Sequence, residues 1–187
     1  MSIRGFARAV LESALAVAAL LVCGVGLLVW SAVHPLPSDD QMRARWHERR
    51  DEFDSLRAMV TDDRRITEVV RSMSGVEFVN HETGMVRHSP DAAIGMSLER
   101  WREHHRLMRD LGIKLGVARG EHGRVTLWVA ERGLVVGEVR KGYVWSPVPL
   151  NPVWDSLDEA VEARAAVAYR PLGDGWWLVI MREDVEG

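Results

Sequence analysis

The chain has 187 residues, with 24 basic and 27 acidic side chains and a formal net charge of −3. This near-balance gives no electrostatic reason to expect nucleic acid as a partner, because surfaces that bind nucleic acid are strongly basic. Its single cysteine, Cys23, leaves the rest of the chain without a disulfide, a thiolate metal site or a cysteine nucleophile. We expect no cofactor and no bound metal.

An uncharged apolar stretch runs from Ser13 to Val33. As a helix it would reach about 30 Å, which matches the hydrocarbon core of a bilayer. It divides the chain into a short cytoplasmic tail (1–12), a transmembrane signal anchor (13–33), a linker (34–40) and a single soluble domain (41–187).

Two other interpretations of this stretch compete with the anchor. A cleaved secretory signal needs small residues before its cleavage site, where this chain has Trp30. A lipoprotein signal would use Cys23, but Val22 stands where a small residue is needed, and apolar sequence continues beyond it. We therefore expect an uncleaved anchor.

The charges that flank the stretch bear on its orientation. Arg4 and Arg8 favour a cytoplasmic tail, whereas Arg43 and Arg45 lie beyond the other end and count in the opposite direction. We expect a single-pass protein of the inner (cytoplasmic) membrane whose soluble domain is extracytoplasmic.

The first part of the soluble domain has the pattern of helices. Pro35 and Pro37 cannot continue a helix, and Ser38 is a candidate N-cap for a new one. An apolar stripe at helical spacing follows, formed by Met42, Trp46, Phe53, Leu56 and Val60. A second helical segment is predicted from the apolar spacing of Ile66, Val69, Val70 and Met73.

Short extended segments are predicted next, over residues 76–79 and 85–88. Ser97 is the candidate cap of a further helix that continues to Leu111, and Gly112 closes it.

From residue 113 to 146 the apolar period changes to two, which predicts strands separated by short turns. Lys141-Gly142 is a candidate break in this meander. Three prolines between 147 and 152 indicate an irregular crossing, and Ser156 begins a capping box for a short helix. Residues 165–170 and 176–182 read as a closing hairpin, and its last strand is apolar on both faces, which is typical of a central strand.

Helices come mainly first and strands later. This order predicts an α+β fold in which helices pack on one face of an antiparallel sheet of about five strands, after the N-terminal transmembrane helix.

Several segments together resemble uncharacterised small bacterial proteins that carry an N-terminal membrane anchor or lipoprotein signal. The resemblance rests on 46–59 (WHERRDEFDSLRAM), 101–112 (WREHHRLMRDLG), 141–143 (KGY), 156–158 (SLD) and 175–178 (GWWL). It implies no activity, and no functional residue follows from it.

Tryptophan is the one compositional excess, with eight residues against three Phe and two Tyr. If the helices cover only one face of the sheet, four tryptophans could form an exposed aromatic strip that docks a protein, a peptide or a glycan. These are Trp128, Trp145, Trp154 and Trp177. In the alternative interpretation they complete the core.

The leading functional interpretation is therefore a membrane-anchored domain without enzymatic activity that binds an envelope protein, a peptide or a second copy of itself. An envelope hydrolase is the alternative. It would use histidines near the open face of the sheet, from the set His81, His88, His104 and His105. No serine lies in a frame that indicates a nucleophile, so no catalytic residue is assigned.

Overall fold

The fold is described from a computed structural model, which places residues 35–63, 66–72, 75–80, 86–87, 97–132 and 138–183. The predicted anchor, 13–33, lies outside these residues. Within the part of the chain that the structure describes, no helix is both long and apolar enough to cross a membrane.

The helices are α2 (Asp39–Glu48), α3 (Arg50–Asp62), α4 (Leu98–Asp110) and α5 (Leu157–Glu162). Ser38, Ser97 and Ser156 cap α2, α4 and α5, as predicted, because each hydroxyl accepts a hydrogen bond from a backbone N–H three residues on. The apolar stripe predicted after Ser38 is buried throughout, but it belongs to two helices, which separate at Arg49.

One eight-stranded sheet contains all the named strands, in the order β3-β2-β1-β4-β5-β6-β8-β7. Every pairing between neighbours in this order is antiparallel. The strands are β1 (Ile66–Ser72), β2 (Gly75–Asn80), β3 (Val86–Arg87), β4 (Gly116–Arg119), β5 (Val125–Arg132), β6 (Glu138–Trp145), β7 (Val167–Gly173) and β8 (Trp176–Glu183). The fold is α+β, with more strands than the five or so predicted.

Two sequence predictions about the strands were wrong, and the first of them explains part of the larger sheet. Residues 66–72 form β1 and not a helix, since β-branched Ile66, Thr67, Val69 and Val70 favour a strand. Lys141-Gly142 does not interrupt β6, which runs unbroken through both residues and pairs with β5 and β8.

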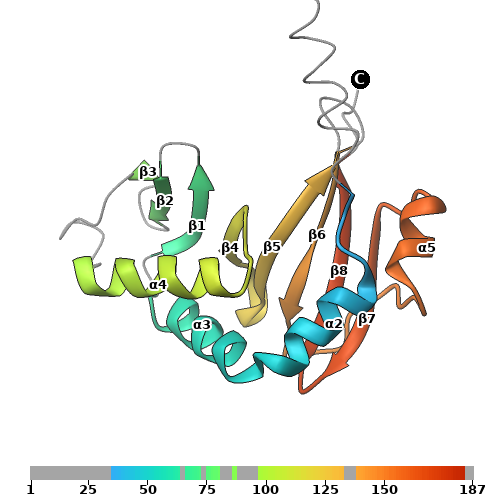
Figure 1. The fold of residues 1–187 in the computed structure, drawn as a ribbon, viewed down its shortest axis with the longest axis horizontal. Coiled ribbons are helices and arrows are strands. Elements are labelled where there is room, and N and C mark those ends of the chain that lie inside the picture. Colours follow the sequence, from blue (N-terminus) through green and yellow to red (C-terminus); the bar gives the residue numbers. More distant parts are fainter. Residues whose placement is uncertain are drawn as a thin grey trace, which may run out of the picture.

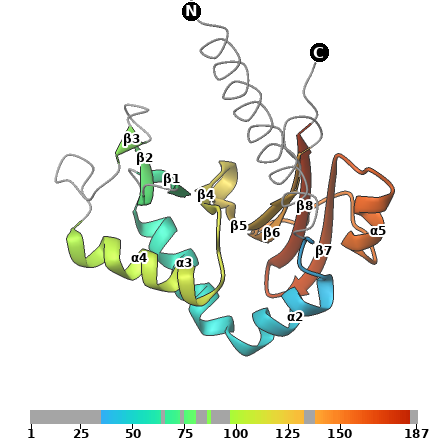
Figure 2. The same ribbon diagram turned by 45° about the horizontal axis from the view of Figure 1, so that its top comes forward.

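Helices α2, α3 and α4 lie on one face of the sheet, below it in Figure 1 and Figure 2, and α5 lies beside β7. The main core fills the space between these helices and the sheet. Phe53 of α3 is its centre, with its ring 4.6 Å from that of Tyr143 and 5.6 Å from that of Trp176. All three side chains are almost completely buried. We call this side the helix face and the opposite side the back face.

The closing hairpin is confirmed, and β8 lies between β6 and β7 as a central strand. Asp174 and Gly175 form its turn with positive φ angles of 52° and 79°. Gly175 also allows close approach, because a Cβ there would lie 2.8 Å from Nε1 of Trp145.

Candidate functional site

Alternate residues of β5 to β8 form the back face. In β6 these are Arg140, Gly142 and Val144, and their cross-strand partners share the face. The apolar members form a second, smaller cluster that is separate from the main core. It consists of buried Val144, Leu150, Tyr169 and Val179 with half-buried Trp128, Val167 and Trp177 packed against them.

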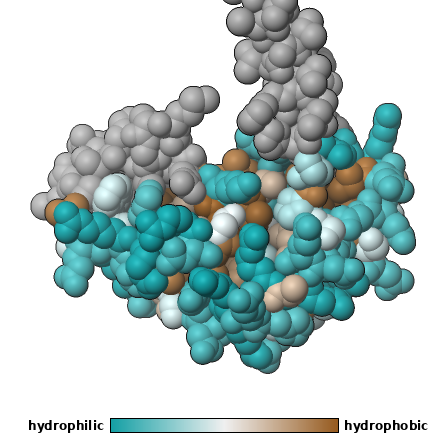
Figure 3. Space-filling view, viewed as in Figure 1, coloured by the Kyte–Doolittle hydropathy of each residue, from teal (hydrophilic) through white to brown (hydrophobic). Residues whose placement is uncertain are grey.

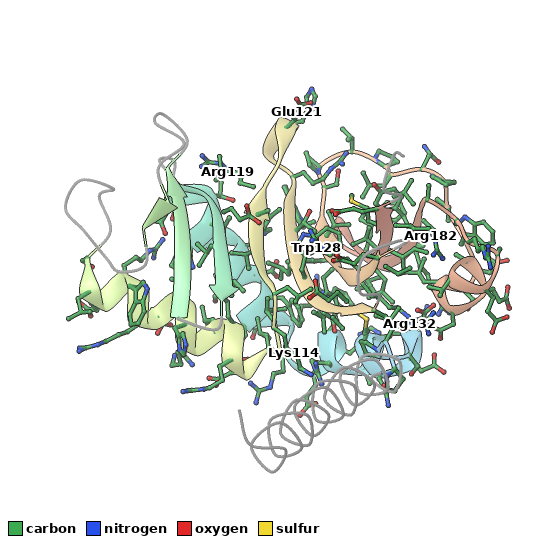
Figure 4. All side chains as sticks on the ribbon, turned by 90° about the horizontal axis from the view of Figure 1, so that it is seen from above. Lys114, Arg119, Glu121, Trp128, Arg132 and Arg182 are labelled. Atoms are coloured by element: carbon green, nitrogen blue, oxygen red, sulfur yellow. The ribbon has the colours of Figure 1, made fainter. Side chains whose placement is uncertain are left out.

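Trp128 and Trp177 therefore share the back face. Trp128 of β5 pairs with Gly142 of β6, while Trp177 of β8 pairs with Val144, two residues further along β6. The indole of Trp128 lies over Gly142, where an added Cβ would be 3.1 Å from its Cε3 atom. Figure 4 views the sheet from above and shows Trp128 near its middle.

The other two predicted tryptophans lie elsewhere. Trp145 packs against the main core on the helix face, where the guanidinium of Arg57 stacks 4.5 Å from its ring centre. Its Nε1 donates to the carbonyl of Asp174 at 3.3 Å. Trp154 also packs against the main core. The structure thus brings two of the four tryptophans together and separates the other two from them.

The proline-rich crossing covers part of the back face. Leu150 is buried there against Val144 and Val179. The crossing is fastened to the edge of β7, because Tyr169 N–H donates to the carbonyl of Pro152 at 3.0 Å. Exposed apolar side chains remain around this cover: Val148 (52% exposed), Val153 (52%) and Met181 (37%). Figure 3 shows hydrophobic side chains gathered in the middle of the molecule, above the mainly hydrophilic surface of the helices.

One end of the back face is charged. The guanidinium of Arg140 lies 2.7 Å from Glu138, 3.2 Å from Glu183 and 3.8 Å from Glu131. Burial and the neighbouring carboxylate of Glu138 raise the pKa of Glu131 above its usual value. Three carboxylates around one guanidinium make this end acidic when all are ionised.

A buried ion cluster lies on the helix face where α2 and α5 begin. Lys141 of β6 is fully buried, and its Nζ lies 2.7 Å from Asp39 Oδ1 and 2.6 Å from Asp158 Oδ1. Asp39, the first residue of α2, also accepts hydrogen bonds at 2.8 Å from the backbone N–H of Leu157 and from Arg170. The cluster joins two helix starts to strands β6 and β7.

Burial acts to raise the pKa of Asp39, but the hydrogen bonds from Lys141 and from Leu157 N–H outweigh it and hold this pKa below its usual value. The Nζ of Lys141 thus lies between two carboxylates, and a lysine held in this way is an ion-pair partner. The cluster accordingly has a structural character.

A histidine and an aspartate meet below β1 and β4. His104 of α4 is 1% exposed, and its Nε2 lies 2.7 Å from Asp63 Oδ2, which also binds Arg100. Burial acts to raise the pKa of Asp63, but His104 and Arg100 outweigh this and lower it. The adjoining cavity, lined in part by Val60 and Val117, has no room for a water molecule.

This pair gives no support to hydrolysis, because His104 is buried on the helix face and not near the open face of the sheet. His105 stacks on Trp101, with ring centres 5.8 Å apart. His81 and His88 lie outside the described residues.

Sequence reasoning missed the Lys141 cluster, although a signal was present. Val139, Lys141 and Tyr143 continue the alternation of β6, which places Lys141 among buried positions. A lysine at such a position requires a carboxylate partner.

No family model, curated protein or solved structure matches the chain.

Proposed function

We propose that this chain is a single-pass membrane protein whose extracytoplasmic domain binds a protein or peptide partner through the back face of its sheet. The observation that carries the proposal is the contrast between the two faces. The helix face is filled by α2, α3 and α4. The described residues cover the back face only in part, and Trp128 and Trp177 lie there together with exposed Met181.

An apolar surface with paired indoles is a favourable docking site. Indole rings bury large areas at a small cost in side-chain entropy, and their N–H groups can still donate hydrogen bonds. The described histidines are not arranged in a way that favours the hydrolase alternative. That alternative stays an untested prediction.

Variants that place a charge on the back face test the proposal. Met181→Arg and Thr126→Arg alter this face without removing a core side chain, since Met181 is exposed and Thr126 is half-buried beside Val144. Ala58→Arg on the exposed side of α3 is the matched control, because it adds the same charge to the helix side.

The measurement is co-purification of the full-length protein from native membranes after mild cross-linking. We expect the back-face variants to lose a partner that the wild type and Ala58→Arg both retain, with melting temperatures unchanged. Equal partner recovery from all four proteins would contradict the proposal.

The proposed topology has its own test. A reporter enzyme that is active only outside the cytoplasm, fused after Gly187, should be active. A reporter that is active only inside would contradict the extracytoplasmic address.

A further inference from the structure

The ion cluster holds an amine against a carboxyl group in an apolar part of the core. Lys141 is fully buried, and so are Ile180, its partner in β8, and Ala168, the partner of Ile180 in β7. The Nζ of Lys141 lies 2.7 Å from Oδ1 of Asp39, whose side chain is 4% exposed. Two groups held in this way can condense to an amide, because their effective concentration is high and the water that would reverse the reaction is kept away.

The two carboxylate oxygens of Asp39 have different surroundings. Oδ2 accepts hydrogen bonds at 2.8 Å from the backbone N–H of Leu157 and at 2.8 Å from Arg170. Oδ1 faces the Nζ of Lys141 and has no other partner among the residues that the structure describes. When an amine attacks a carboxyl carbon, negative charge develops on one oxygen and the other oxygen leaves. The donors on Oδ2 are placed to stabilise that charge, as in an oxyanion hole, and Oδ1 is free to leave.

Asp158 supplies a proton carrier at the same place. Its Oδ1 lies 2.6 Å from the Nζ of Lys141, and its Oδ2 accepts a hydrogen bond from the backbone N–H of Asp39 at 3.3 Å. The second contact fixes the carboxylate beside the two reacting groups. Because the Asp158 side chain is 52% exposed, this part of the cluster also contacts solvent, into which a released water molecule can pass.

We propose that Lys141 and Asp39 form an intramolecular isopeptide bond, an amide that ties the start of α2 to β6, with Asp158 as the acid–base group. The ion pair is the starting state. One proton moves from Nζ to Oδ1 of Asp39, which neutralises the buried pair. A bond then forms between Nζ and Cγ of Asp39. Asp158 takes a second proton from Nζ and delivers it to Oδ1, and the bond from Cγ to Oδ1 breaks to release water.

The reaction converts an ammonium and a carboxylate into one amide and one water molecule. It uses no oxidant, reductant or cofactor. The bond would close a loop of about a hundred residues with a link that reducing agents do not break. This inference does not depend on the proposed partner of the back face.

Peptide mapping of the full-length wild-type protein tests the bond. Trypsin cleaves after lysine and arginine, so an unlinked chain gives one peptide that contains Asp39 and ends at Arg43, and another that begins at Gly142. In the linked protein the Lys141 side chain is blocked, and trypsin does not cleave after it. We expect the segment that ends at Arg43 and the segment 141–164 to stay joined, with a mass one water below their sum.

The wild-type digest decides the existence of the bond without any variant. Separate peptides with complete cleavage after Lys141 would overturn the inference. Loss of water within segment 141–164 alone would also overturn it, because the bond would then join Lys141 to Asp158.

Variants test the role of each group. General acid–base groups contribute roughly 10²–10⁴-fold to rates, so Asp158→Asn should lower the joined fraction at least about tenfold at the same time after synthesis. Asp155→Asn, at an exposed position outside the cluster, is the matched control and should join as completely as the wild type. Lys141→Arg keeps a cation but should give no joined peptide. Undiminished joining in Asp158→Asn would overturn the role of Asp158, and joining in Lys141→Arg would overturn the bond.

Discussion

The two faces of the sheet are built from the same strands but differ in what covers them. On the helix face, Trp46, Phe53, Tyr143 and Trp176 pack into one continuous core under three helices. On the back face, a small cluster lies partly under an irregular crossing and ends in charged residues. Adjacent residues of one strand thus lie in different surroundings: the helix face holds the fold together, and the back face is the one that we propose binds a partner.

The neighbouring tryptophans of β8 offer the largest test of this contrast. Trp176→Ala should lower the free energy of unfolding by about 4 kcal/mol, because it empties a fully buried site and removes the hydrogen bond to Asp54. Trp177→Ala, at a half-buried position on the back face, should cost about 1–2 kcal/mol. Urea unfolding of the full-length protein in detergent measures both, and equal losses would contradict the assignment of the two faces.

The chain contains only two lysines, Lys141 in the ion cluster and Lys114 outside it. The same substitution at Lys114 therefore serves as the control for Lys141. Lys141→Met should destabilise the protein by about 3 kcal/mol, because it leaves the carboxylate of Asp39 buried with less compensation. Lys114→Met, at an exposed position, should change stability by less than about 0.5 kcal/mol. The same unfolding assay applies. A Lys141→Met protein as stable as wild type would show that the ion pair contributes nothing net.

Gly142 of β6 lies close to both the backbone of β5 and the indole of Trp128. In Gly142→Ala the new Cβ would collide with the carbonyl oxygen of Leu127 and press on Trp128, so we expect a loss of about 2 kcal/mol. The fluorescence emission of Trp128 should change as well. The change that Gly142→Ala causes should therefore disappear when the substitution is made in a Trp128→Phe protein. If the emission change persists in that background, the indole does not lie over Gly142.

Acid should weaken the helix face through Asp63. Its pKa is below the usual 3.8, so the stabilisation it provides is fully present above about pH 4 and is lost as the pH falls through the lowered pKa. Asp63→Asn should cost about 1.5 kcal/mol at neutral pH and flatten the decline of the melting temperature below pH 4. An unchanged acid limb in this variant would show that Asp63 is not the responsible carboxylate.

Replacing Glu131 should have the smallest effect on the free energy of unfolding, and the effect should have the opposite sign to that of replacing Asp63. Its raised pKa means that ionisation opposes folding, so its contribution is most favourable below the unfolded-state pKa and declines as the pH rises. Glu131→Gln should therefore stabilise the protein slightly at neutral pH, by less than about 0.5 kcal/mol, because the side chain is 46% exposed. A loss of stability would indicate that its pairing with Arg140 dominates.

Local signals in the sequence were enough for the caps at Ser38, Ser97 and Ser156 and for the closing hairpin, because their determinants lie within a few residues of each other. The segment that forms β1 was misread. Ile66, Val69, Val70 and Met73 fit a helical stripe by spacing, and only the β-branched character of the first three favoured the strand.

The site depended on information that is not local. Trp145 directly follows Val144, so alternation alone places it on the opposite face from Val144, but the faces could be assigned only once the pairing of β6 with β8 was known. One partner of Lys141 is equally distant, since Asp39 lies about a hundred residues away along the chain. Such contacts follow from topology and cannot be read from spacing.

The ion cluster at the start of α2 also has a mechanical consequence. In the anchored protein that we propose, a pull on the membrane segment would reach α2 at Asp39, whose carboxylate Lys141 and Arg170 connect to two strands of the sheet. The ion cluster would then carry tension from the bilayer into the sheet.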